Sequence, residues 1–288
     1  MIKGLFCGLT GLDITYYQNE YPLENQKSKT NDYRTFVGGP AANAAITYAI
    51  LGGNTTLITC LGNSIIAKAI KTELLEEYNI DVIDMAADSQ QLPSLSSVLV
   101  NMKKASRTIW SGQQQFYIND ENIYEQMINE SDFCFSDCNL PEISIGFLKK
   151  VRESEKDIVL DTGSWKPHFP ECLKLADEII ASITCNPPGS DLLTFLKDTK
   201  VKNIAITDGE NDTFWLESSN SGLIKVPKIQ SVDTLAAGDI LHGAYCYYRF
   251  HEKNSFVNAL EKATLVASES VKYFGPREGV YNIKKNKF

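Results

Sequence analysis

Apolar segments of strand length alternate with segments of helical period along nearly the whole 288-residue chain. The segments predicted as strands are Ile2–Leu9, Thr55–Leu61, Asp132–Ser136, Asp157–Leu160, Glu178–Thr184 and Asn203–Thr207. The segments predicted as helices are Ala41–Leu51, Ile65–Glu77, Glu142–Glu153, Ser190–Leu196, Ile240–Phe250 and Ser255–Tyr273. Several strand segments are continuously apolar, which is typical of strands buried on both faces of a parallel sheet. The alternation therefore predicts an α/β fold, a three-layer α/β/α sandwich around a mostly parallel sheet.

Two stretches interrupt this alternation, at about 14–36 and 95–110. The first is polar and rich in tyrosine, and the second predicts two short strands, Leu95–Asn101 and Arg107–Trp110, joined by a turn. We expect them to form a small antiparallel lid over the strand ends, where open α/β sheets bind ligands. An ordinary edge hairpin is the alternative for the second stretch. Because the sequence has no repeats, low-complexity tracts or linkers, we expect residues 1–288 to form a single domain.

The charge balance limits the partners of the chain. Its 28 Lys and Arg against 36 Asp and Glu give a net charge of −8, with no basic run. We therefore expect neither a nucleic acid nor a membrane partner. No apolar run approaches the roughly 20 residues that cross a bilayer, and the amino terminus lacks the pattern of a signal peptide. The seven cysteines lie mostly within apolar segments without a CxxC pair, which predicts buried reduced thiols in a cytoplasmic protein.

The strongest chemical signal is the small-residue loop Ser231–Gly238 followed by Asp239 and an apolar helix. The backbone amides of Ala236, Ala237 and Gly238 are expected to converge on an anion at the positive end of the helix dipole. Asp239 lies in the first turn of that helix. A carboxylate beside an anion suits the acceptance of a proton from a hydroxyl that attacks a phosphoryl group. An acidic first helical turn without a catalytic role explains the same residues equally well.

A second small-residue cluster spans 38–45, with the sequence GGPAANAA. Gly38 and Gly39 permit close approach to a ligand, and Asn43 offers both a donor and an acceptor to a hydroxyl-rich partner. Asp13, just after the first strand, can accept hydrogen bonds from two hydroxyls. Tight packing of helix against sheet is the alternative explanation for the glycine pair.

Together, GGPAANAA at 38–45 and DTLAAGD at 233–239 resemble the two signatures of the ribokinase family of carbohydrate kinases, also called the phosphofructokinase-B (PfkB) family. Their order and their separation of close to 200 residues also match. The resemblance implies a lidded α/β/α sandwich that uses ATP as co-substrate, with Mg²⁺. It implies Asp239 as general base, with the anion hole formed by Ala236, Ala237 and Gly238. The implied substrate-binding residues are Asp13, Gly38, Gly39, Asn43 and the lid arginine Arg107.

The resemblance also implies a nucleotide site, formed by Asn186, Thr207, Gly209 and Gly238, with the loop Tyr273–Gly279 beside the adenine. Asp233 matches a position linked to a monovalent cation, K⁺, in some relatives. The chain departs from the family in two places. Gly189 stands where relatives carry the glutamate that organises Mg²⁺, so the ligands of Mg²⁺ stay open. Pro40 replaces a lysine of ribokinases proper, which argues against ribose.

These features lead to the hypothesis of an ATP-dependent kinase that phosphorylates a hydroxyl of a sugar or sugar derivative. The missing lysine and the lid segment Ser106–Ile109 favour a ketose or fructosyl-type acceptor. A nucleoside kinase is one alternative. It would need an aromatic slot for the base, and the candidates for that slot are Tyr16, Tyr17, Phe36 and Trp110. A catalytically silent sugar-binding protein is the other. By analogy with the family, the lid is also a candidate surface for a homodimer.

Overall fold

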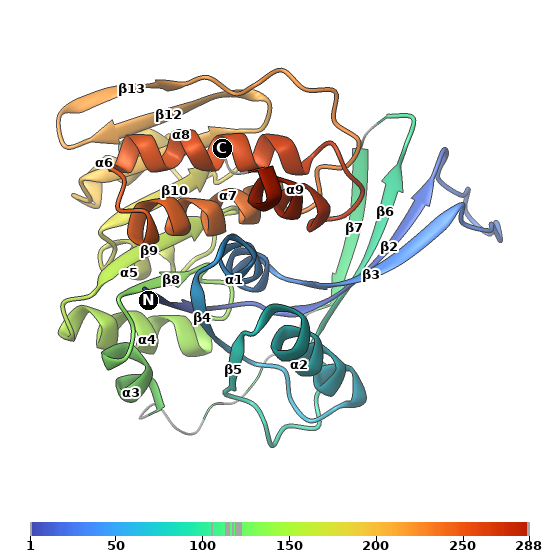
Figure 1. The fold of residues 1–288 in the computed structure, drawn as a ribbon, viewed down its shortest axis with the longest axis horizontal. Coiled ribbons are helices and arrows are strands. Elements are labelled where there is room, and N and C mark those ends of the chain that lie inside the picture. The colour runs from blue at the N-terminus through green and yellow to red at the C-terminus, as the bar shows by residue number, and fades with distance from the viewer. Residues whose placement is uncertain (1, 105, 113–115, 117, 119–122, 287–288) are drawn as a thin grey trace.

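The computed structural model describes residues 2–104, 106–112, 116, 118 and 123–286 (Figure 1). Its main sheet has nine strands in the order β13-β12-β11-β10-β9-β8-β1-β4-β5. Their bounds are β1 (Lys3–Cys7), β4 (Asn54–Thr59), β5 (Asp81–Asp84), β8 (Phe133–Ser136), β9 (Asp157–Thr162), β10 (Glu178–Ser182), β11 (Asn203–Asp208), β12 (Asn211–Glu217) and β13 (Asn220–Ile224). All neighbours from β5 to β11 pair in parallel, and only β12 and β13 pair antiparallel. The predicted mostly parallel sheet is thus confirmed.

Helices cover both faces of this sheet. One face packs against α1 (Pro40–Leu51), α2 (Ile65–Tyr78), α7 (Ala237–Cys246), α8 (Phe256–Ser270) and α9 (Glu278–Asn286). The other packs against α3 (Ile123–Asn129), α4 (Pro141–Glu153), α5 (Phe169–Leu173) and α6 (Leu192–Asp198). Consecutive residues of β1 point to opposite faces, so Phe6 joins the first core cluster and Leu5 the second. The chain is a three-layer α/β/α sandwich.

The predicted strands and helices are present with their ends shifted by a few residues, and the structure adds elements that the sequence did not reveal. The predicted helix Ile240–Phe250 is α7 followed by a π-helical turn, η1 (Tyr247–His251). The hairpin of β12 and β13 was missed because it lies at the sheet edge. Most of its residues are exposed or half-buried, so it lacks the continuous apolar signal of the central strands.

The lid is a separate sheet of four strands in the order β3-β2-β6-β7. The strands are β2 (Gly11–Gln18), β3 (Asp32–Gly38), β6 (Ser94–Asn101) and β7 (Ser106–Gly112). Figure 1 shows them standing away from the helices and the main sheet. The expectation of an antiparallel lid needs correction, because β2 and β6 pair in parallel from Gly11–Ser94 to Gln18–Asn101. Both strands leave the base of the lid in the same direction, which makes this pairing parallel.

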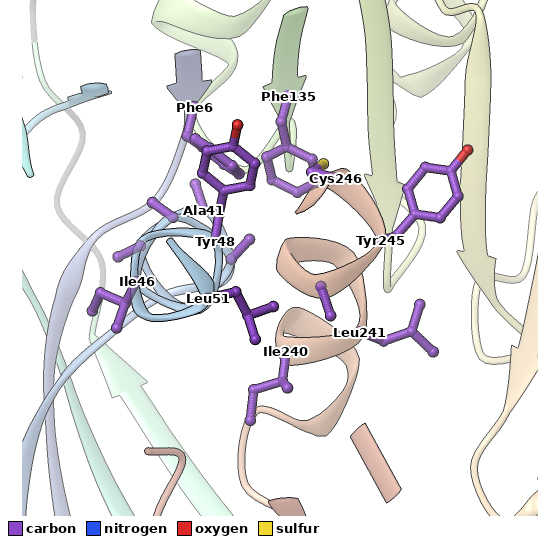
Figure 2. Close-up of a cluster of buried hydrophobic side chains, with 14 of the residues drawn as sticks. Phe6, Ala41, Ile46, Tyr48, Leu51, Phe135, Ile240, Leu241, Tyr245 and Cys246 are labelled. Atoms are coloured by element: carbon purple, nitrogen blue, oxygen red, sulfur yellow. The ribbon is translucent and has the colours of Figure 1, made fainter. Parts of the chain in front are cut away.

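Helices α1 and α7 pack against each other at very short range. The glycine Gly243 of α7 faces α1 so closely that an added Cβ would lie 2.2 Å from the carbonyl oxygen of Ala44. The side of α1 around this contact consists of fully buried alanines, among them Ala41 and Ala45. Figure 2 shows the apolar packing of this layer, with Ile46 and Leu51 on α1 and Ile240 on α7. This packing places the amino-terminal ends of the two helices together.

We expect Gly243→Ala to lower the stability of the fold. The new methyl group has no room against the Ala44 carbonyl, and overpacking of this kind costs about 1–3 kcal/mol. Gly238→Ala is the matched control in the same helix, because an added Cβ there meets nothing within 4 Å. Urea unfolding of both variants measures the effect. Equal midpoints for the two variants would show that the α1–α7 contact tolerates a side chain.

Candidate active site

A cavity of about 710 Å³ lies between the lid, the carboxyl ends of the central strands and the start of α7. Asp161 of β9, Ser182 of β10 and Thr207 of β11 line it at the strand ends. The residues predicted for the site that line this cavity are Asp13, Gly39, Asn43, Arg107, Thr207, Gly209, Ala236, Ala237, Gly238 and Asp239. Gly38, Asn186 and Asp233 do not line it. The two sequence clusters, although far apart along the chain, thus meet in one cavity.

The start of α7 leaves backbone amides free for an anion. Ala236 adopts the left-handed conformation with φ 57° and precedes the first helical residue, Ala237. The amide of Ala237 donates to the carbonyl oxygen of Thr234 at 3.3 Å, so it is already engaged. The amides of Ala236, Gly238 and Asp239 have no hydrogen-bond partner within the described part of the chain. The free donors are therefore those of 236, 238 and 239, rather than the expected 236–238.

Asn43 and Asp239 contact each other directly. The amide nitrogen Nδ2 of Asn43 donates to Oδ2 of Asp239 at 2.8 Å. The other end of the Asn43 side chain, Oδ1, is buried and has no partner among the described residues. That oxygen is out of contact with solvent, so Asn43 acts in the site through its amide group, which holds the Asp239 carboxylate in place.

Negative charge is concentrated around Asp239. Burial, and then the charge of Asp161, raise the pKa of Asp239 to about 7, while the hydrogen bond from Asn43 and the charge of His242 oppose the rise. Asp137 adds a further raising contribution to this pKa. A carboxyl group whose pKa lies near neutrality can accept and release a proton under physiological conditions.

Gly38 and Gly39 leave room for atoms of the protein itself, namely the Asp13 carboxylate and the backbone of Leu9. An added Cβ on Gly38 would lie 2.1 Å from the Asp13 carboxylate, so only glycine lets that side chain lie across the β2–β3 pair. Gly39 has φ +96°, and an added Cβ would lie 2.3 Å from the carbonyl oxygen of Leu9. Burial raises the pKa of Asp13, against the hydrogen bond from Ser96 and the charge of Arg277. Gly38 thus makes room for the Asp13 carboxylate within the lid sheet, a contact between strands rather than the packing of helix against sheet that was the alternative.

Asp137 was missed by the sequence analysis, although it organises the site. Its Oδ2 accepts hydrogen bonds from the amides of Leu9 at 3.0 Å and Ala41 at 2.9 Å, and its Oδ1 accepts from the amide of Asn139 at 2.8 Å. It therefore joins the ends of β1 and β8 to the first turn of α1. Burial raises its pKa to about 6. Its position directly after an apolar strand was the available signal.

The far end of the cavity has an apolar wall, formed by Val226, Pro227, Ile229 and Val271. Thr207 and Gly209 also line the cavity. The loop Tyr273–Gly279 does not line the cavity. Instead, the ring of Phe274 packs on Tyr17 of the lid, with ring centroids 4.9 Å apart.

Asp233, the position linked to a monovalent cation, and Asp191, close to the departure at Gly189, both accept hydrogen bonds within the protein. The buried Asp233 carboxylate accepts from the amides of Leu235 at 2.9 Å and Gly275 at 3.0 Å, and from the Tyr17 hydroxyl at 3.3 Å. Asp191, near Gly189, caps α6 by accepting from the amide of Thr194 at 3.0 Å. In the described part of the chain, no group of three or more His, Cys, Asp and Glu is placed to hold a metal ion.

None of the described helices is long and apolar enough to span a membrane.

Comparison with known proteins agrees with this geometry. The chain is 23% identical to the ribokinase of Haemophilus influenzae over 267 residues, which covers 86% of this chain and 85% of the relative. Its fold superposes on the ribokinase of Thermotoga maritima with a TM-score of 0.78 at 20% identity, covering 99% of each chain. It superposes on Arabidopsis thaliana ribokinase, solved in complex with ribose and ATP, with a TM-score of 0.75 at 19% identity, covering 100% of this chain and 99% of that one. Residues 5–282 match the pfkB family of carbohydrate kinases. The chain therefore belongs to the pfkB family of carbohydrate kinases, which are phosphotransferases with an alcohol group as acceptor.

Proposed function

We propose that the chain transfers the γ-phosphoryl group of ATP to a hydroxyl of a sugar or sugar derivative, with Asp239 as general base. The observation that carries this proposal is the Asn43–Asp239 hydrogen bond beside the free amides of α7. Asp239 removes the proton of the acceptor hydroxyl, and Asn43 holds the Asp239 carboxylate in place through its amide group. The hydroxyl oxygen forms a bond to the γ-phosphorus, and the bond from that phosphorus to the bridging oxygen breaks, which releases ADP.

Positioning and fixed dipoles supply most of the rate acceleration in such a transfer. The amides of Ala236, Gly238 and Asp239 face the γ-phosphoryl oxygens without reorganising, because α7 holds them. The adenine lies against the apolar wall at the far end of the cavity. Mg²⁺ enters with ATP as part of the substrate complex. The lid excludes water, which would otherwise compete with the sugar as acceptor.

The acceptor end of the cavity favours a polyhydroxyl compound. Besides Asp13 and Asn43, the hydroxyls of Ser94, Ser96 and Ser111 line it. A ketose or fructosyl-type sugar remains our proposal within this class. None of the described residues that line the cavity is a phenylalanine, tyrosine or tryptophan, and the four aromatic candidates for a base slot all lie elsewhere. The observation argues against a nucleoside as acceptor.

An ADP-release assay with a panel of aldoses, ketoses and nucleosides tests this proposal. We expect turnover with a sugar, and a loss of about 10²–10⁴ in kcat for Asp239→Asn, because the base is removed while the hydrogen bond to Asn43 can persist. Asp88→Asn, at an exposed aspartate, is the matched control and keeps full activity. Sugar-dependent thermal stabilisation without turnover would identify a silent binding protein instead.

The raised pKa of Asp239 predicts a pH dependence for turnover. The group must be ionised to accept a proton, so kcat/KM should fall about tenfold per pH unit as the pH drops below about 7. At higher pH the rate should reach a plateau. A pH profile at fixed ionic strength measures this. A kcat/KM that stays constant as the pH falls to the ordinary pKa range of carboxyl groups would contradict the assignment of a buried base.

The surroundings of Asp233 do not fit the monovalent cation that the resemblance implies, because two peptide amides and the Tyr17 hydroxyl already donate to its carboxylate. We therefore derive no catalytic step through K⁺. Thermal unfolding in potassium chloride and in choline chloride at equal ionic strength should give the same midpoint. Tyr17→Phe should lower both midpoints equally. A rise specific to potassium that saturates with concentration would overturn this inference.

A further inference from the structure

Lys166 lies in the active-site cavity, on the loop that follows β9. Of the described residues that line this cavity, only Lys166 and the lid residue Arg107 are lysine or arginine. The carboxylates that line it are those of Asp13, Asp161, Glu210 and Asp239. These acids oppose the binding of a strongly anionic ligand such as a nucleoside triphosphate. Each of the two cations therefore matters for the affinity of the cavity for such a ligand.

Lys166 and the start of α7 reach the cavity from opposite faces of the main sheet. The anion cradle is the set of three amides at the start of α7, those of Ala236, Gly238 and Asp239. The following residue, Ile240, packs in the first core cluster. The loop of Lys166 leads instead to α5, whose Phe169 packs in the second core cluster, on the other face. A ligand between them has the cradle on one side and the loop of Lys166 on the other.

The end of β9 connects these two parts of the cavity wall. Oδ1 of Asp161 lies 3.5 Å from Nε2 of His242, which is in the second turn of α7. Burial raises the pKa of Asp161, and the charge of Lys166 is among those that oppose the rise. Lys166, Asp161 and the start of α7 thus surround the same part of the cavity.

The loop that carries Lys166 is held in place by other residues. The ring of Trp165 packs edge-on against Phe195 of α6, with ring centroids 5.1 Å apart. The carbonyl oxygen of Gly163 accepts a hydrogen bond from the Thr184 hydroxyl, just after β10, at 3.0 Å. The position of the Lys166 backbone therefore does not depend on contacts of its own ammonium group.

The ammonium group of Lys166 has only uncharged partners in the protein. Nζ donates to the carbonyl oxygen and to Oγ of Ser164, both at 3.3 Å, and lies 5.2 Å from the centroid of the Phe169 ring. Both hydrogen bonds are longer than the roughly 2.9 Å that is typical of N–H···O contacts. A phosphate oxygen carries charge and accepts a shorter and stronger hydrogen bond from an ammonium group. A phosphate in the cavity would thus be a better partner for Nζ than Ser164.

We propose that Lys166 is a nucleotide-binding residue whose ammonium group contacts the phosphate chain of ATP from the side opposite the anion cradle. The contact rests on the proposed kinase function. During transfer, the bond between the γ-phosphorus and the bridging oxygen breaks, and its electron pair stays on that oxygen as part of ADP. The Lys166 ammonium stabilises this charge, while the cradle amides face the transferred group. Lys166 thereby adds a side-chain cation to a cradle made of backbone.

Calorimetric titration with ADP and with adenosine tests the contact without turnover. We expect Lys166→Gln to weaken ADP binding by about 10- to 100-fold, because a hydrogen bond between charged groups is lost. Adenosine carries no phosphate, so its affinity should stay as in the wild type. Lys166→Arg keeps a cation that binds phosphate and should retain most of the ADP affinity.

Lys174→Gln is the matched control, because Lys174 is an exposed lysine directly after α5 that does not line the cavity. It should bind both ligands as the wild type does. Equal losses for ADP and adenosine in Lys166→Gln would show that Lys166 only supports its loop, and unchanged ADP binding would show that it does not contact phosphate. Either result overturns the proposal. A wild type that binds neither ligand would refute the proposed function itself.

Steady-state kinetics distinguishes the nucleotide from the acceptor as the ligand of Lys166. In the ADP-release assay, Lys166→Gln should lower kcat/KM for ATP and leave the KM for the sugar unchanged. A change confined to the KM for the sugar would assign Lys166 to the acceptor and refute its contact with ATP.

Discussion

The site depends on how closely α1 and α7 pack. Because Gly243 has no side chain, the Ala44 carbonyl lies where a Cβ would otherwise be, and the two helices begin side by side. That closeness brings Asn43 within 2.8 Å of Asp239, although 196 positions separate them in the chain. One helix presents a side-chain amide that donates to the carboxylate of the other helix, and that other helix also presents free peptide donors. A wider spacing of the two helices would leave both small-residue clusters intact but would separate Asn43 from Asp239.

In the proposed transfer, a chain with a net charge of −8 binds the phosphoryl group through its backbone. Peptide amides at a helix start carry partial positive charge whatever the net charge of the protein. Buried carboxylates around the cradle would weaken this attraction, and they also raise the pKa of Asp239. The same negative field therefore makes Asp239 a stronger base.

The fold was predictable because the strand–helix alternation reflects burial on both faces of the sheet, which the apolar pattern records directly. The two small-residue clusters were predictable because glycine and alanine are required wherever backbones approach. Two features could not be read in this way. The free amides of the cradle depend on the left-handed turn at Ala236, and the contact of Asp137 with α1 depends on tertiary structure. Periodicity reports which residues are buried, not which atoms they face.

The lid and the cradle are joined at two consecutive residues. Tyr17 of β2 donates to the Asp233 carboxylate, and Arg107 of β7 donates to the Thr234 hydroxyl. These residues immediately precede the turn that exposes the cradle amides. Because the contacts come from two lid strands, a movement of the lid must change the restraint on this loop. The same two hydrogen bonds thus hold two lid strands against the loop that precedes the cradle amides.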